Sequence, residues 1–202
     1  MKLIVITTPT FFVEEDKIIT ALFEEGLEIL HLRKPETSSM FAERLLTLIP
    51  QKFHSRIVTH EHFYLKEEFN LRGIHLNVRN PNEPHDYEGH ISCSCHTTEE
   101  VKSKKHFYDY VFLSPIYDSI SKVNHYSMHT PEELRQAQKE KIIDSKVIAL
   151  GGINADNLLE IKDFGFGGAA VLGDLWGRFD PYNDNNYLAV VDHFKELKRL
   201  AE

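Results

Sequence analysis

The sequence has few of the features that mark secreted, membrane-spanning or disulfide-rich proteins. Its 202 residues include two cysteines, too few for a disulfide framework or a cysteine-based zinc site. No apolar run approaches the roughly 20 residues that cross a bilayer. The opening segment, MKLIVITTPT, predicts a strand and not a signal peptide. We therefore expect a cytoplasmic protein that does not bind membranes.

Positive charge is also scarce. The chain has 23 Lys and Arg against 31 Asp and Glu, which gives a net charge of −8. An acidic chain without a basic run is a poor binder of nucleic acids and anionic membranes. Small anions remain candidate ligands, because a few cations and backbone N–H groups in one cleft are enough to bind them. The apolar fraction of 42% supplies a sizeable core and excludes wholesale disorder.

Short apolar runs alternate with stretches of helical period. Strand–helix alternation predicts parallel βαβ units. Eight strand-like runs in about 200 residues predict a compact (β/α)8 TIM barrel, an α/β fold, formed by residues 1–202 as one domain. A doubly wound open sheet is the alternative, although no G-x-G-x-x-G follows the first run. The strand-like runs lie near residues 3–7, 28–34, 56–60, 73–77, 90–96, 109–117, 146–152 and 167–173.

Local signals place individual side chains within this pattern. Thr130, Pro131 and Glu133 have the spacing of an N-cap, an N1 proline and a capping-box acid, which predicts a helix start. We expect Asp174 to cap the segment after the last strand. Cys93 and Cys95 are expected to point to opposite faces of their strand, so that no disulfide joins them.

In a barrel of this kind, functional residues lie at the carboxyl ends of the strands. Gly151-Gly152 allows close backbone approach to a phosphate, and Arg33 offers a guanidinium fork for phosphate oxygens. His60 and His62 share a strand face, as two metal ligands would, but no third ligand is evident. The other polar or glycine residues at predicted strand ends are His31, Lys34, Glu61, His75, Ser94, Ser119, Ser121, Lys122 and Gly173.

Several segments resemble the thiamine phosphate synthase family, which includes the related thiazole tautomerases. HLRK at 31–34, GIHL at 73–76 and SCSCHTTEE at 92–100 match family segments in order. DYVFLSPIYDSISK at 109–122 is the most specific match, and VIALGGI and AAVLG resemble the last two strands. The resemblance implies a (β/α)8 barrel. It also implies a transferase that joins an aminopyrimidine diphosphate to a thiazole phosphate, releasing diphosphate.

The same resemblance assigns roles by position. It implies that Arg33, Ser94 and Lys122 are catalytic, with Arg33 on the diphosphate and Lys122 neutralising the leaving group. Glu61 is the candidate ligand of a magnesium ion, whereas the second acidic ligand of the family falls near Arg79 and Asn80. The implied substrate-binding residues are His31, Lys34, His60, His75, Ser119, Ser121, Gly151, Gly152, Leu172 and Gly173.

Two other functions stay open from the sequence. One is a tautomerase that acts on a thiazole carboxylate phosphate, with a cleft histidine as acid and base. The other is a regulatory protein that binds a phosphorylated ligand without turning it over. The expected partners are small phosphorylated thiazole and pyrimidine diphosphate molecules, and a homo-oligomer is possible.

Overall fold

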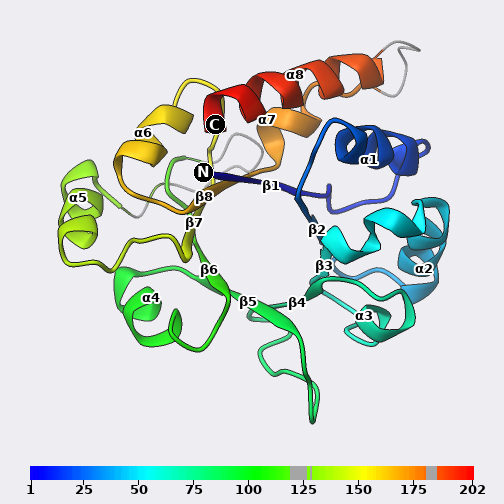
Figure 1. Ribbon diagram of the computed structural model, residues 1–202, viewed down its shortest axis with the longest axis horizontal. Helices are drawn as coiled ribbons and strands as arrows, with labels where there is room; N and C mark the ends of the chain where they lie inside the picture. Colours follow the sequence, from blue (N-terminus) through cyan, green and yellow to red (C-terminus); the bar gives the residue numbers. More distant parts are fainter. Residues whose placement is uncertain (119–126, 128, 181–185) are drawn as a thin grey trace.

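The computed structural model describes residues 1–118, 127, 129–180 and 186–202, which form a closed barrel of eight parallel strands (Figure 1). The strands pair in sequence order, and β8 pairs with β1 to close the barrel. This topology confirms the predicted (β/α)8 barrel over the open sheet. The strands are β1 Lys2–Ile6, β2 Ile29–Leu32, β3 Ile57–Thr59, β4 Gly73–Leu76, β5 His90–Cys95, β6 Tyr110–Leu113, β7 Val147–Leu150 and β8 Gly168–Val171.

Helices surround the barrel on its outside (Figure 1). The segment between β4 and β5 has no helix, and it projects away from the body of the molecule (Figure 1). None of the described helices is long and apolar enough to span a membrane. The helices are α1 Glu15–Glu24, α2 Ser39–Leu48, the 3-10 helix η1 Gln51–Arg56, α3 Leu65–Glu68, α4 Thr98–Lys104, α5 Pro131–Lys139, α6 Leu158–Asp163, α7 Gly173–Trp176 and α8 Asn186–Ala201.

Strand alternation divides the core into two parts. Outward-facing residues such as Leu3 and Val5 pack under the helices in the larger cluster. Inward-facing residues such as Ile4, Tyr110 and Phe112 form a smaller cluster inside the barrel. The interior is therefore a packed layer of side chains and not a channel. This layer supports the polar groups at the strand ends.

Two local predictions have different outcomes. The Thr130 hydroxyl accepts from the backbone N–H of Glu133, whose carboxylate accepts from Thr130 N, so the predicted capping box of α5 is confirmed. The prediction that Cys93 and Cys95 point to opposite faces is wrong, because residues two apart on a strand share a face. Both thiols are free and buried in the outer cluster.

Candidate active site

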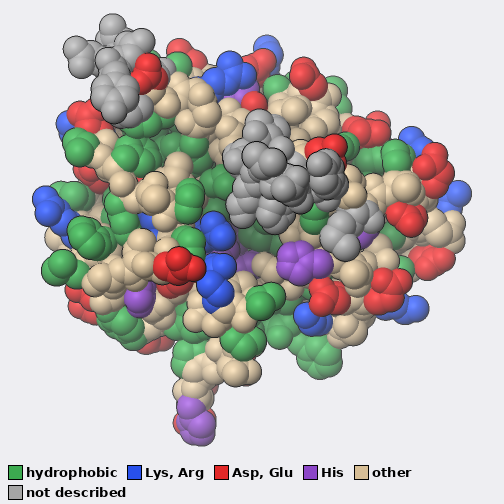
Figure 2. All heavy atoms as spheres, turned by 180° about the vertical axis from the view of Figure 1, so that it is seen from behind, with side chains coloured by type: hydrophobic (Ala, Val, Ile, Leu, Met, Phe, Trp, Pro, Cys, Tyr) green, Lys and Arg blue, Asp and Glu red, His purple; other side chains and the backbone are tan. Residues whose placement is uncertain are grey.

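The carboxyl ends of the strands open on one face of the barrel, and we call this region the mouth. Figure 2 shows this face, where Lys, Arg and His side chains gather around a central hollow. The cations come from a chain whose net charge is −8. The positive charge at the mouth is therefore local, as a site for an anionic ligand requires.

Three histidines from β2, β3 and the following strand β4 meet inside the mouth. His31 and His75 are completely buried, and His60, the first residue after β3, is 4% exposed. His31 Nδ1 lies 2.8 Å from His60 Nε2, and the rings of His60 and His75 stack with their centres 4.2 Å apart. Parallel strands in register bring together residues that are separated by 29 and 15 positions in the chain.

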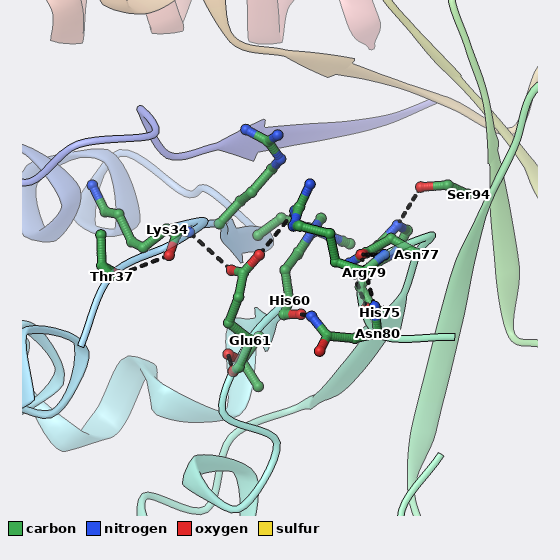
Figure 3. A network of polar contacts seen from close by, with 12 residues as sticks. Lys34, Thr37, His60, Glu61, His75, Asn77, Arg79, Asn80 and Ser94 are labelled. Carbon is green, nitrogen blue, oxygen red and sulfur yellow. Dashed lines mark hydrogen bonds and ion pairs between the residues drawn. The ribbon is translucent and has the colours of Figure 1, made fainter. Parts of the chain in front are cut away.

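Side chains deeper in the barrel hold the rings of His31 and His75. His31 Nε2 lies 2.6 Å from the hydroxyl of Tyr110 on β6. Ser92 Oγ donates to Ile74 O, so His75 Nδ1 donates to Ser92 Oγ at 2.8 Å. The other nitrogen of His75, Nε2, then accepts from the partly exposed Ser94 hydroxyl at 2.9 Å (Figure 3). The hydroxyl of Ser94 is thus oriented at the mouth.

Burial keeps the three imidazoles neutral. Loss of solvation is the largest cause that lowers the pKa of His31 and of His60 well below the usual value, and neighbouring histidines lower both further. The same desolvation lowers the pKa of His75 to about 3. Imidazoles with such values are weak bases at neutral pH, so they are poor proton abstractors.

A network of charges lies directly above the histidines (Figure 3). The Glu61 carboxylate accepts from the backbone N–H of Lys34 at 2.9 Å and pairs with Arg79 Nη2 at 3.0 Å. Burial is the main cause that lowers the pKa of Arg33. The nearby Arg79 guanidinium lowers this pKa further, whereas the Glu61 carboxylate raises it. Among the described residues the Arg33 guanidinium has no hydrogen bond and no ion pair. Two guanidiniums thus face one carboxylate.

The side chain of Lys34 lies on the other side of this segment and is nearly completely buried. Its ammonium is 2.5 Å from the Glu15 carboxylate on α1 and 2.9 Å from Thr10 O. Burial raises the pKa of Glu15 to about 7 and lowers that of Lys34, so desolvation opposes both charges. The substrate-binding role of Lys34 stays a prediction, and its ammonium ties α1 to β2.

Backbone conformation and close packing account for the two glycines after β7. Gly151 and Gly152 have φ angles of 100° and 66°, which side chains rarely adopt. A Cβ on Gly152 would also lie 2.4 Å from Asp118 O, in the segment after β6. The glycines therefore let two neighbouring strand ends approach closely. Phosphate binding by their backbone N–H groups stays a prediction.

The segment after β8 is not capped by Asp174, as the sequence had suggested it would be. Leu172 follows the strand and Gly173 begins α7, so both predicted substrate-binding residues lie at the mouth end of β8. The prediction that Asp174 is a cap is wrong. Its carboxylate instead lies 2.6 Å from Nε2 of His193 on α8, because α7 turns it toward that helix.

One further predicted residue lies away from the site, and three others lie outside the described residues. The pairing of His60 with His62 on one face is wrong: His62 has a φ of 53°, and its Nε2 bonds Thr37 O instead. Ser119, Ser121 and Lys122 lie outside the described residues. Their implied roles stay predictions.

Sequence reasoning predicted no role for Arg79, and it placed Asn77 at the end of its strand without predicting the turn that Asn77 forms. Arg79 was noted only for lacking an acid, although it supplies the second guanidinium of the mouth. Asn77 Oδ1 accepts from the backbone N–H groups of Arg79 and Asn80 and so turns the chain back over the barrel. An Asn two residues before Arg79 was the available signal, because Asn side chains often form such turns.

The fold and the mouth define a class of protein: a (β/α)8 barrel with buried histidines and two guanidiniums at its strand ends. A family model described as thiamine monophosphate synthase matches residues 3–175. The chain therefore belongs to the thiamine monophosphate synthase family.

Individual relatives agree with this family. The chain is 77% identical to a crystal structure described as thiamine phosphate pyrophosphorylase from Bacteroides thetaiotaomicron, with a TM-score of 0.93, and the match covers 100% of this chain and 98% of that one. It is 36% identical over 89 residues to a thiamine-phosphate synthase of Actinobacillus succinogenes, covering 43% of this chain and 40% of that protein. Identity to the thiamine-phosphate synthase of Prochlorococcus marinus is 25%, over 82% of this chain and 50% of that protein. The matches thus span half or less of these two curated relatives.

Proposed function

We propose that this chain is a transferase that makes thiamine phosphate from an aminopyrimidine diphosphate and a thiazole phosphate. The observation that carries the proposal is the 77% identity, over the whole chain, to a protein described as thiamine phosphate pyrophosphorylase. The mouth supports it chemically, since Arg33 is a half-buried cation without a partner among the described residues. Such a group favours a multiply charged anion.

In the proposed reaction, the bond from the pyrimidine methylene carbon to the diphosphate oxygen breaks. A bond from that carbon to the thiazole nitrogen forms, and diphosphate leaves. Negative charge grows on the leaving group, so the main requirement is fixed positive charge beside it. Arg33 and Arg79 supply that charge. The catalytic role of Ser94, whose hydroxyl is bonded to His75, stays a prediction. We assign the thiazole phosphate to backbone N–H groups at Gly152 and Gly173.

The residues at the mouth do not fit a magnesium ion held by Glu61. Magnesium requires oxygen ligands in a near-octahedral set. Both carboxylate oxygens of Glu61 already accept hydrogen bonds, one of them in an ion pair with Arg79. Arg33 adds a second cation nearby, and like charges repel a divalent ion. We therefore derive no step through magnesium, and the ligand role of Glu61 stays a prediction.

The tautomerase alternative is weaker at this site. It needs a histidine that takes a proton near neutral pH, whereas burial lowers the pKa of His31, His60 and His75. The regulatory alternative makes no product, so an assay for thiamine phosphate formation separates it from the transferase. A cytoplasmic location and a homo-oligomer remain predictions.

The Arg33→Ala variant tests the diphosphate site. Loss of one charge-assisted contact costs about 1.5–3 kcal/mol of binding, or roughly 10- to 150-fold in affinity. We expect inorganic diphosphate to bind that much more weakly in calorimetry. Arg44→Ala is the matched control, since it removes the same charge from the exposed face of α2. Equal affinity in both variants would remove Arg33 from the site.

A further inference from the structure

Among the described residues, one group of three metal-ligating side chains comes together, and it is made of His31, His60 and His75. One ring nitrogen from each can be chosen so that all three lie within 4.8 Å of one another. The three residues come from neighbouring strands of a rigid barrel, so their backbones are fixed. Nothing in the proposed transferase reaction uses this grouping.

We propose that His31, His60 and His75 form a binding site for a divalent transition-metal ion of the zinc type. Imidazole nitrogen suits zinc, cobalt, nickel and copper, whereas magnesium prefers oxygen. Three histidines with an open fourth position are a known arrangement for zinc that binds a further ligand. This site does not include Glu61, the residue for which the sequence implied a magnesium ion.

One pair of nitrogens is near the spacing that a tetrahedral ion needs, and the third nitrogen, within 4.8 Å of both, must approach them. With zinc–nitrogen bonds of about 2.0–2.1 Å, ligand nitrogens in such a site lie about 3.3 Å apart. His31 Nδ1 and His60 Nε2 are 2.8 Å apart, joined by a single shared proton. A metal ion between them would take the place of that proton. The rings then separate by a few tenths of an ångström, while the ring of His75 moves toward them.

The remaining nitrogens have the partners that metal-bound histidines usually have. A ligating histidine generally donates its other N–H to a fixed acceptor, which sets its tautomer and orientation. Tyr110 Oη serves His31 Nε2, and Ser92 Oγ serves His75 Nδ1. His31 Nδ1 and His75 Nε2 are therefore the ligand atoms. Burial also keeps these rings unprotonated, which leaves their lone pairs available.

The fourth position faces the mouth. The hydroxyl of Ser94 lies 2.9 Å from His75 Nε2, so it lies beside the ion or beside a water bound to it. The carboxylate of Glu61, the residue after His60, is already paired with Arg79. An anionic ligand, such as a phosphate or carboxylate oxygen, would therefore balance the charge of the ion. Metal and anion are expected to bind more tightly together than alone.

Cobalt titration of the metal-free full-length protein tests the proposal without any activity assay. We expect one Co²⁺ per chain, the intense visible absorption of a tetrahedral nitrogen site, and displacement by Zn²⁺. His60→Asn should weaken Co²⁺ binding about 100-fold or more, because it removes a ligand. His62→Asn is the matched control and should bind like wild type, since His62 contacts Thr37 O outside the cluster.

Two results would overturn the site. One is a wild-type protein that takes up no Co²⁺, or shows only the pale spectrum of an octahedral ion. The other is a folded His60→Asn variant with wild-type affinity. Should that variant fail to fold, His60→Gln replaces it, and the wild-type spectrum still decides whether three nitrogens hold the ion. Because no turnover is measured, failure here leaves the proposed transferase function untouched.

Discussion

Lys34→Met is expected to destabilise the protein by about 1–3 kcal/mol, because it removes the partner of a buried carboxyl group, whose pKa burial already raises to about 7. Glu15 is 1% exposed, and its other oxygen, Oε2, is buried without a hydrogen-bond partner among the described residues. The Lys34 ammonium is the group that compensates the charged oxygen, at 2.5 Å. The free energy of unfolding in urea gives the size of the effect.

Two further variants separate the charge effect from other losses. Lys34→Met combined with Glu15→Met should recover most of the stability, because a buried pair can be replaced by apolar groups of similar volume. Lys17→Met removes a cation from an exposed pair with Glu14 and should change little. A stable Lys34→Met protein that has lost diphosphate binding would contradict the structural role and favour Lys34 as a substrate ligand.

Acid is expected to unfold the metal-free protein well above the pH at which most carboxylates titrate. The native state disfavours protons on His31, His60 and His75, because burial lowers their pKa values, to about 3 for His75. In the unfolded chain the same groups titrate near 6.5. Below that pH the unfolded state binds more protons, so stability falls as the pH falls toward the native pKa values.

The expected slope is steep. Each such histidine contributes up to about 1.4 kcal/mol per pH unit, or roughly 4 kcal/mol per unit for the three together. Glu15, whose pKa burial raises to about 7, opposes this by up to about 1.4 kcal/mol per unit below pH 7 and leaves a net slope of roughly 3 kcal/mol per unit. Unfolding free energies at pH 7.5, 6.5 and 5.5, with chelator present, measure it. His75→Asn should lower the histidine contribution to the slope by about a third, even if it lowers stability at every pH. Stability that stays flat from pH 7.5 to 5.5 would show that the histidines are not held neutral.

The sequence predicted the barrel and most of the residues at its mouth. His31, His60, His75 and Ser94 were found because the carboxyl ends of parallel strands meet on one face. Their mutual bonds were not predicted, since strand spacing gives a face but no distance. His62 was assigned wrongly because β3 ends at Thr59 and the chain turns before residue 62.

Contacts made by loops were the hardest to foresee. Lys34 followed a strand like the other candidates, yet its side chain turns to Glu15 because the segment before α1 folds over it. Tyr110 supports the histidines from β6 and resembled an ordinary core aromatic in the sequence. Its inward direction follows because Tyr110 and Phe112 are two positions apart on one strand and so share a face. Its contact with His31 could not be inferred, because closure of the barrel brings the two strands together.

The proposed transferase joins two phosphorylated substrates at the mouth of the barrel. The direct measurement is mass-spectrometric detection of thiamine phosphate after the purified protein is incubated with the aminopyrimidine diphosphate and the thiazole phosphate, over a series of Mg²⁺ and Zn²⁺ concentrations. We expect thiamine phosphate and diphosphate in equal amounts, with formation strongly reduced in Arg33→Ala and unchanged in Arg44→Ala. A folded wild-type protein that forms no thiamine phosphate under any of these conditions would contradict the proposed function.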